Sequence, residues 1–355
     1  MCMTGEVHLI RVGRKFVPGE HHGGVARARM DREEADVLTP RRGLVLGGGG
    51  VLGGTWSVGA LDALQDIGID VDDFDIIVGT SAGSVLGALV TLGVSLEEMR
   101  GHYAGDDVGT GPLAHYAFDP DRATGGHRPG VPRLLAPGSP ALIASSMRHP
   151  GKLPVTAVLS ALLPPGSRSL DQVSQLIDAA NPAGIWPQRL WVVAMDFVDG
   201  HRVVFGRSGA PVAPLADAVV ASCSIPGWFA PVAINGRAYV DGGAVSATSV
   251  DVLEHMGLDE VYVIAPMVSF ATDHPTSLAA RLERRWRGEV TKSCLDEAET
   301  VRAQGTRVFI LGPGPEDLTA MGANLMDASR RRLVLETSMR TSPAGWARSL
   351  ELRAS

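Results

Sequence analysis

A serine stands between glycines in the pentad Gly79-Thr80-Ser81-Ala82-Gly83. An apolar run, Phe74 to Val78, precedes it and a small-residue apolar stretch, Ser84 to Leu92, follows it, so the pentad is predicted to join a strand to a helix. Backbones approach closely at so sharp a turn, which requires glycine, and the turn lifts the hydroxyl clear. The helix would point its N-terminal amides toward charge developing on a bound carbonyl. We predict a nucleophile elbow carrying Ser81, the alternative being an ordinary Gly/Ser turn.

Glycines also dominate residues 47 to 54, directly after a short apolar run. Such a loop offers several backbone N–H groups to one anion, as an oxyanion hole or a phosphate cradle requires. Gly48, Gly50 and Gly53 match the dinucleotide pattern GxGxxG, but Gly79-Thr80-Ser81 stands where that fold has its acidic residue. Gly54 replaces the lysine of a P-loop. A nucleotide is therefore disfavoured, which leaves an oxyanion hole or a purely structural turn.

An aspartate followed by two glycines, Asp241-Gly242-Gly243, comes after a predicted hairpin whose turn is Asn235-Gly236. A serine needs a base, and a desolvated carboxylate can accept its proton directly. A triad in the order Ser, Asp, His would need His255 or His274, which we expect in a surface helix and a polar loop respectively. We predict that Asp241 is the proton acceptor and that both histidines are bystanders, although Asp-Gly is also a common turn.

Strand, turn and helix alternate along the chain, which predicts an α/β fold with three α/β/α layers and a mostly parallel central sheet. Further strands are predicted at residues 190–196, 202–205, 261–265 and 307–311, and helices at 55–68, 170–180, 215–222, 278–304 and 316–339. Residues 102–165, rich in Pro and Gly, interrupt this rhythm as an insertion. This insertion could form a lid or an apolar vestibule that admits acyl chains, but we expect helices that only cap the sheet.

The composition sets limits on the class of protein. Apolar residues make up 45% and charged residues 20% of the 355, so a full-sized core is expected and global disorder is excluded. A net charge of −7 argues against a nucleic-acid partner, and we expect the basic clusters at 284–287 and 330–332 to be solvated helix faces. Three scattered cysteines make neither a disulfide framework nor a zinc site. The first 15 residues contain no apolar core of an export signal, so we expect a cytoplasmic protein whose membrane contact would be peripheral.

Taken in order, the three motifs resemble the patatin-like phospholipase family: GGGVLG at 48–53, GTSAG at 79–83 and DGG at 241–243. The resemblance covers about residues 43–266. It implies an oxyanion hole at Gly48, Gly49 and Gly50, a Ser81–Asp241 dyad without histidine, and no metal or organic cofactor. It also marks Gly53, Gly79, Gly83, Gly242 and Gly243 as motif glycines, and the stretch from Ala221-Ser222 to Pro231 as the segment before the dyad aspartate.

Two positions depart from the family's pattern. Leu52 stands where the oxyanion loop usually has Arg or Lys, and Thr248-Ser249-Val250 replaces an Asn-Pro pair after the aspartate. The first change bears on head-group preference, and the second on hydrogen bonding near Asp241.

We expect three parts. Residues 1–40, rich in Gly, Arg, His and acidic groups without sustained periodicity, are predicted to be a loosely ordered extension. An acyl hydrolase domain is expected at 43–312 and a helical segment at 313–355. The expected function is that of a lipid acyl hydrolase of phospholipase A, lysophospholipase or esterase type, which cleaves carboxylic esters through an acyl-enzyme. Its partners would be phospholipids, lysophospholipids or acyl esters, with peripheral membrane contact and no nucleic acid. The alternatives are an acyltransferase with the same dyad and a catalytically silent lipid-binding protein of the same fold.

Overall fold

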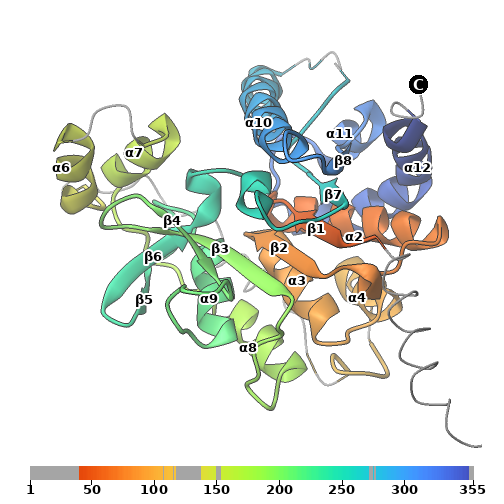
Figure 1. The fold of residues 1–355 in the computed structure, drawn as a ribbon, viewed down its shortest axis with the longest axis horizontal. Helices are drawn as coiled ribbons and strands as arrows, with labels where there is room; N and C mark the ends of the chain where they lie inside the picture. Colours follow the sequence, from red (N-terminus) through yellow and green to blue (C-terminus); the bar gives the residue numbers. More distant parts are fainter. Residues whose placement is uncertain are drawn as a thin grey trace, which may run out of the picture. The chain divides into compact units, whose positions relative to one another are not determined.

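A computed structural model describes residues 40–106, 108–114, 116, 137–148, 153–271, 275 and 277–351 (Figure 1). The chain divides into two units, residues 1–40 and 41–355, and every helix and strand named below belongs to the second. The predicted N-terminal extension lies almost wholly outside the described residues. The domain boundaries inferred from the sequence therefore stay predictions.

Eight strands form one mixed sheet, in the order β5-β6-β3-β2-β1-β7-β8, with β4 also paired to β3. The strands are β1 (Arg42–Leu46), β2 (Ile76–Thr80), β3 (Leu190–Asp196), β4 (Arg202–Phe205), β5 (Val232–Ile234), β6 (Arg237–Asp241), β7 (Glu260–Ile264) and β8 (Arg307–Leu311). Pairing is parallel from β3 through β2, β1 and β7 to β8, and antiparallel among β4, β3, β6 and β5. This confirms the predicted α/β class with a mostly parallel sheet.

Helices cover the sheet on both faces (Figure 1). The α-helices are α2 (Gly50–Asp66), α3 (Ala82–Thr91), α4 (Leu96–Ala104), α6 (Pro140–Arg148), α7 (Val155–Leu162), α8 (Asp171–Ala180), α9 (Leu215–Cys223), α10 (Leu278–Arg302), α11 (Pro315–Met321) and α12 (Arg331–Glu351). Short 3-10 turns are η1 (Val71–Asp73), η2 (Gly242–Ala244), η3 (Val250–Leu253) and η4 (Ala328–Arg330).

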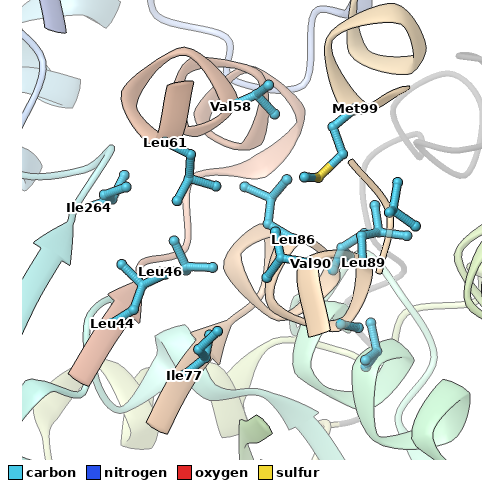
Figure 2. Close-up of a cluster of buried hydrophobic side chains, with 14 of the residues drawn as sticks. Leu44, Leu46, Val58, Leu61, Ile77, Leu86, Leu89, Val90, Met99 and Ile264 are labelled. Atoms are coloured by element: carbon cyan, nitrogen blue, oxygen red, sulfur yellow. The ribbon is translucent and has the colours of Figure 1, made fainter. Parts of the chain in front are cut away.

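Alternation along each strand assigns side chains to the two faces. Leu44 and Leu46 of β1 join Ile77 and Ile264 in a core completed by α2, α3 and α4 (Figure 2). Val45, between them in sequence, points into the other core, which α10 and η3 close. Strands buried on both faces read as continuous apolar runs because helices take the place of solvent on each side. The sheet is thus the middle of three layers.

Several boundaries differ from the prediction. The single C-terminal helix predicted at 316–339 is two helices, because α11 ends at Met321, just before Gly322 with its φ of +68, and α12 begins only at Arg331. Helix α2 starts at Gly50, within the glycine loop rather than after it. The Asn235-Gly236 turn is as predicted, since both residues have the positive φ that a two-residue hairpin requires.

Candidate active site

Strand β3 brings the two predicted catalytic residues together. Thr80, the last residue of β2, is paired with Val193. The next residue of β3, Ala194, is paired with Asp241 at the end of β6. Ser81 and Asp241, 160 positions apart in sequence, therefore leave the sheet from the two neighbours of one strand. The two side chains lie near enough for the Ser81 hydroxyl to lower the pKa of the Asp241 carboxyl.

Ser81 occupies the predicted strand-to-helix elbow. Its backbone has φ 53 and ψ −125, a conformation that an L-residue adopts only when its surroundings hold it. The flanking glycines are required by close approach: a Cβ on Gly79 would lie 2.5 Å from the carbonyl oxygen of Gly83, and one on Gly83 would lie 1.9 Å from that of Leu46. Helix α3 follows at once, so its N-terminus faces the Ser81 hydroxyl region.

A second serine supports this strained turn. The backbone N–H of Ser81 donates to Oγ of Ser222, 2.9 Å away, and that hydroxyl donates to the carbonyl oxygen of Val193 at 2.6 Å. Ser222 lies in α9 and is fully buried. In the sequence, Ser222 is marked only as part of the segment that precedes the dyad aspartate. The structure places its hydroxyl between the elbow and strand β3.

The carboxylate of Asp241 lies in a desolvated position, with the residue only 5% exposed. Its Oδ1 accepts the N–H of Gly243 at 2.7 Å. Burial raises the pKa of Asp241 to about 6, while the hydrogen bonds from Gly243 and Ser81 oppose that rise. The following Gly242 is held against β3, where a Cβ would lie 2.6 Å from the oxygen of Val193. The aspartate is therefore more basic than a solvated carboxylate and faces a hydroxyl.

The glycine-rich loop passes directly beside Ser81. A Cβ on Gly48 would lie 3.2 Å from the Cβ of Ser81. The N–H of Gly48 donates to the carbonyl oxygen of Ala247 at 2.8 Å, so in this structure it anchors the loop. Gly49 is extended and Gly50 has φ +62, which brings the chain into α2. An oxyanion hole in this conformation would therefore use the amides of Gly49 and Gly50.

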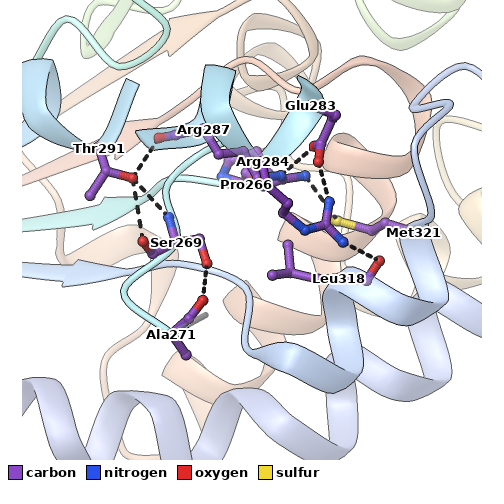
Figure 3. Close-up of polar contacts among 9 residues, drawn as sticks. All are labelled: Pro266, Ser269, Ala271, Glu283, Arg284, Arg287, Thr291, Leu318 and Met321. Carbon is purple, nitrogen blue, oxygen red and sulfur yellow. Dashed lines mark hydrogen bonds and ion pairs between the residues drawn. The ribbon is translucent and has the colours of Figure 1, made fainter. Parts of the chain in front are cut away.

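A buried arginine binds Pro266, the residue that packs against that loop, and Figure 3 shows the polar contacts around it. Arg287 of α10 donates to the carbonyl oxygen of Pro266, whose ring lies against Gly49 and Gly53. The carboxylate of Glu283 pairs with Arg287 and with Arg284. The prediction of a solvated basic face is wrong for Arg287, whose side chain is 1% exposed, because the turn after β7 supplies an acceptor that sequence spacing does not reveal.

An apolar cavity of about 100 Å³ opens at Ser81. Helices α2, α3, α4, α8 and α12 and the loop after α9 contribute its walls. The lining residues are Gly50, Val51, Gly54, Ser81, Ala82, Val85, His102, Tyr103, Leu170, Val173, Leu176, Cys223, Ile225, Phe229, Met326 and Arg331. A cavity of this composition accommodates an aliphatic chain next to the serine.

Three polar residues of this cavity were missed by sequence reasoning. His102 is buried, and desolvation, with a smaller effect of Arg331, lowers its pKa to about 4. Burial also raises the pKa of Tyr103 and lowers that of Arg331. Arg331 was expected on a solvated face, which is wrong because α12 turns it toward the cavity, where the residue is 8% exposed. No motif marks any of the three.

Of the two histidines considered for a triad, the structure describes only His255. His255 lies in a turn after η3, not in the surface helix expected, and its φ is +62. Its ring is 70% exposed and contacts Glu254 and Gln304. His274 lies outside the described residues.

Among the described residues, no three His, Cys, Asp or Glu side chains are grouped as metal ligands, and no helix is long and apolar enough to cross a bilayer.

The fold and the elbow serine define the class of protein, and comparison with known families gives its membership. The Patatin-like phospholipase profile matches residues 44–253, more than half of the chain. The chain belongs to the patatin-like phospholipase family. Members of this family are lipid hydrolases, so lipid hydrolysis is the activity of the family as a whole.

The individual relatives and solved structures that match share limited sequence identity with this chain. Uncharacterized NTE family proteins of Mycobacterium tuberculosis and Mycobacterium bovis are 30% identical over 207 residues, which is 58% of this chain. The chain spans only 43% of the length of those relatives. Among solved structures, VipD from Legionella pneumophila matches at 13% identity and a TM-score of 0.40, covering 88% of this chain and 67% of that one. The type III effector protein ExoU matches at 13% identity and a TM-score of 0.32, covering 88% and 53%.

Proposed function

We propose that this protein is a serine hydrolase that cleaves carboxylic esters of lipids through a Ser81–Asp241 dyad. The observation that carries the proposal is the position of the Ser81 hydroxyl, which lines an apolar cavity and lies near enough to the buried Asp241 carboxyl to lower its pKa. A hydroxyl, a base and a space for an aliphatic chain are what acyl transfer from a lipid ester requires.

The reaction has two halves. Asp241 accepts the hydroxyl proton while Ser81 Oγ attacks the ester carbonyl, and amides of Gly49 and Gly50 donate to the tetrahedral oxyanion. The proton passes to the leaving alcohol as the ester bond breaks, which leaves an acyl group on Ser81. Water then attacks the acyl-enzyme and gives a proton to Asp241. That proton passes to Ser81 Oγ as its bond to the acyl group breaks, which releases the fatty acid and restores the free serine and the ionised aspartate.

The electrostatics of the site favour a single carboxylate as the base. Because burial raises the pKa of Asp241 to about 6, its proton affinity lies nearer to neutrality than that of an exposed aspartate. A general base works best with a pKa near the pH at which the enzyme operates. Leu52 stands where the family usually has a cation in the oxyanion loop, and Arg331 is a basic residue that lines the cavity.

A fluorophosphonate probe tests the nucleophile. The wild type should be labelled, Ser81→Ala should not, and Ser174→Ala, which removes a hydroxyl from α8, should be labelled like the wild type. Equal labelling of the wild type and Ser81→Ala would remove Ser81 from the proposal. No labelling of the folded wild type would favour a lipid-binding protein without turnover.

Acyl transfer uses the same acyl-enzyme and differs only in the acceptor. Incubation of the protein with a lipid ester and an added alcohol, followed by product analysis, separates the two. We expect free fatty acid as the main product, and a new ester as the main product would identify a transferase.

A further inference from the structure

Helices α6 and α7 pack side by side against one end of the sheet (Figure 1). Leu142 of α6 and Ala157 and Ala161 of α7 are fully buried against Met195, Phe197 and Val240, all in or next to β3 and β6. Thr156 Oγ1 donates to the carbonyl oxygen of Ala244 at 2.7 Å. Ala244 lies three residues after Asp241, so α7 rests directly on the turn that carries the proposed base.

The opposite side of α7 is apolar but exposed. Its exposed fractions are 73% for Val155, 54% for Leu159, 55% for Leu162 and 45% for Leu163. Val155, Leu159 and Leu162 repeat at i, i+4 and i+7 and so form one stripe along the helix. Leu163 continues this stripe just past the end of α7, and the four residues are here called the α7 stripe. Met147, at the end of α6, is 78% exposed. A contiguous aliphatic stripe in water is unfavourable unless something covers it.

The charge of the surrounding sequence indicates what covers it. Residues 122–170 contain six Lys or Arg and no Asp or Glu, although the whole chain has a net charge of −7. The stretch from Leu153 to Ser167 has no charged residue at all. Two of the basic residues are described: Arg148 is exposed and Arg168 is half-buried. Aliphatic side chains in a stretch of sequence whose charged residues are all basic match an anionic lipid surface, whose acyl region takes the aliphatic side chains and whose head groups attract the cations.

One residue of the α7 stripe contacts a loop that contributes to the cavity wall. Just past α7, the side chain of Leu163 lies against Gly227, where a Cβ would be 3.1 Å from the Leu163 Cβ. Gly227 is in the loop that contributes Ile225 and Phe229 to the cavity wall. A surface that received the α7 stripe would therefore lie beside the loop through which an aliphatic chain would pass to Ser81.

We propose that the α7 stripe docks the protein on the surface of an anionic bilayer. The aliphatic side chains enter the boundary between head groups and acyl chains, and the exposed Arg148 at the end of α6 faces the anionic head groups. This docking does not depend on hydrolysis, so Ser81→Ala should bind vesicles as the wild type does.

Vesicle co-sedimentation tests the docking with vesicles of phosphatidylcholine, alone or mixed with phosphatidylglycerol. The double variant Leu159→Ser with Leu162→Ser should reduce partitioning onto the mixed vesicles by about tenfold or more. A matched control exists on α10, where Leu278 and Leu282 are 82% and 71% exposed beside Arg281 and Arg285. Leu278→Ser with Leu282→Ser should bind as the wild type does. Arg148→Glu should weaken binding most at low salt, where charge is least screened.

Several results would overturn the docking proposal. These are unchanged binding of the α7 double variant, loss of binding in the α10 control, equal binding of the wild type to both kinds of vesicle, or no binding at all. If size exclusion shows a wild-type dimer that the α7 double variant converts to a monomer, without vesicle binding, the stripe is an interface between copies. Hydrolysis of a soluble short-chain ester should be unchanged in the α7 double variant. If the wild type did not hydrolyse this soluble ester, that result would count against the proposed function but would leave the docking result intact.

Discussion

The hydroxyl of Ser222 links the elbow serine to the central strand, since it accepts the N–H of Ser81 at 2.9 Å and donates to the oxygen of Val193 at 2.6 Å. Both partners are backbone groups inside the core, where water cannot replace a missing partner. The strained backbone at Ser81 is thus fixed by a side chain from α9, 141 positions further along the chain.

Ser222→Ala should lower both stability and turnover. It leaves a buried N–H and a buried carbonyl without that hydroxyl, which should reduce the free energy of unfolding by about 1–3 kcal/mol. Because Ser81 then loses its fixed position, kcat should fall while KM changes little. Urea unfolding and ester hydrolysis measure the two effects. Ser224→Ala is the control, because that hydroxyl bonds within α9 to Val220, and a kcat loss equal to that of Ser222→Ala would contradict the positioning role.

Hydrolysis should depend on the ionisation of Asp241. The pKa of this carboxyl is about 6, so the rate should be half-maximal near pH 6 and fall below it as the base becomes protonated. A pH profile of kcat/KM on a soluble ester checks this. If Asp241→Asn kept substantial activity and its kcat/KM still fell below pH 6 as in the wild type, another group would be the base.

The raised pKa of Asp241 also predicts how the stability of the protein depends on pH. Since burial raises the carboxyl pKa from 3.8 to about 6, the folded state binds the proton more tightly than the unfolded chain. The wild type should therefore lose stability as the pH rises between these values, by about 3 kcal/mol. Asp241→Asn removes the buried charge, so its free energy of unfolding should exceed that of the wild type at pH 8 by more than at pH 5. Urea unfolding at both values gives the comparison, and an inactive variant that is less stable at pH 8 would contradict it.

His102 is the histidine nearest to a possible catalytic role, since it shares the cavity with Ser81. Its pKa of about 4 means that it is neutral at physiological pH, and its ring packs between Tyr103 and Tyr116. His102→Phe keeps an aromatic ring there and should reduce kcat by less than about tenfold, whereas loss of a general base typically costs 10²–10⁴. The limb of the pH profile near 6 should remain. Loss of turnover in a folded His102→Phe protein would replace the dyad by a histidine-assisted mechanism.

Two glycine substitutions should have opposite effects. Gly83→Ala places a Cβ 1.9 Å from the oxygen of Leu46, a backbone atom that cannot move aside, so it should cost at least about 3 kcal/mol. Gly288, within the exposed part of α10, has nothing within 4 Å of the same atom. Gly288→Ala should stabilise the protein by about 1 kcal/mol, since alanine is the better helix former. Thermal unfolding of both variants tests this, and a Gly83→Ala protein as stable as the wild type would show that the elbow can relax.

Sequence by itself determined the local elements, the family and the fold class. Strands β3 and β8 have the predicted bounds, because a continuous apolar run identifies a strand buried on both faces. The Gly79–Gly83 pentad was placed at a strand-to-helix turn for a reason that is also local, since side-chain-free positions mark close backbone approach. The catalytic roles of Ser81, Asp241 and the glycine loop stay predictions that rest on this geometry.

Only the tertiary structure decided which of these residues meet. The register of β3 aligns Val193 with Thr80 and Ala194 with Asp241, and such pairing across long separations leaves no trace in local spacing. For the same reason, the burial of Arg287 and Arg331 could not be predicted, because the burial of a charged side chain depends on acceptors and walls that other elements supply. Local preference fixes what each segment becomes, while the environment of a side chain is created by segments far away in the chain.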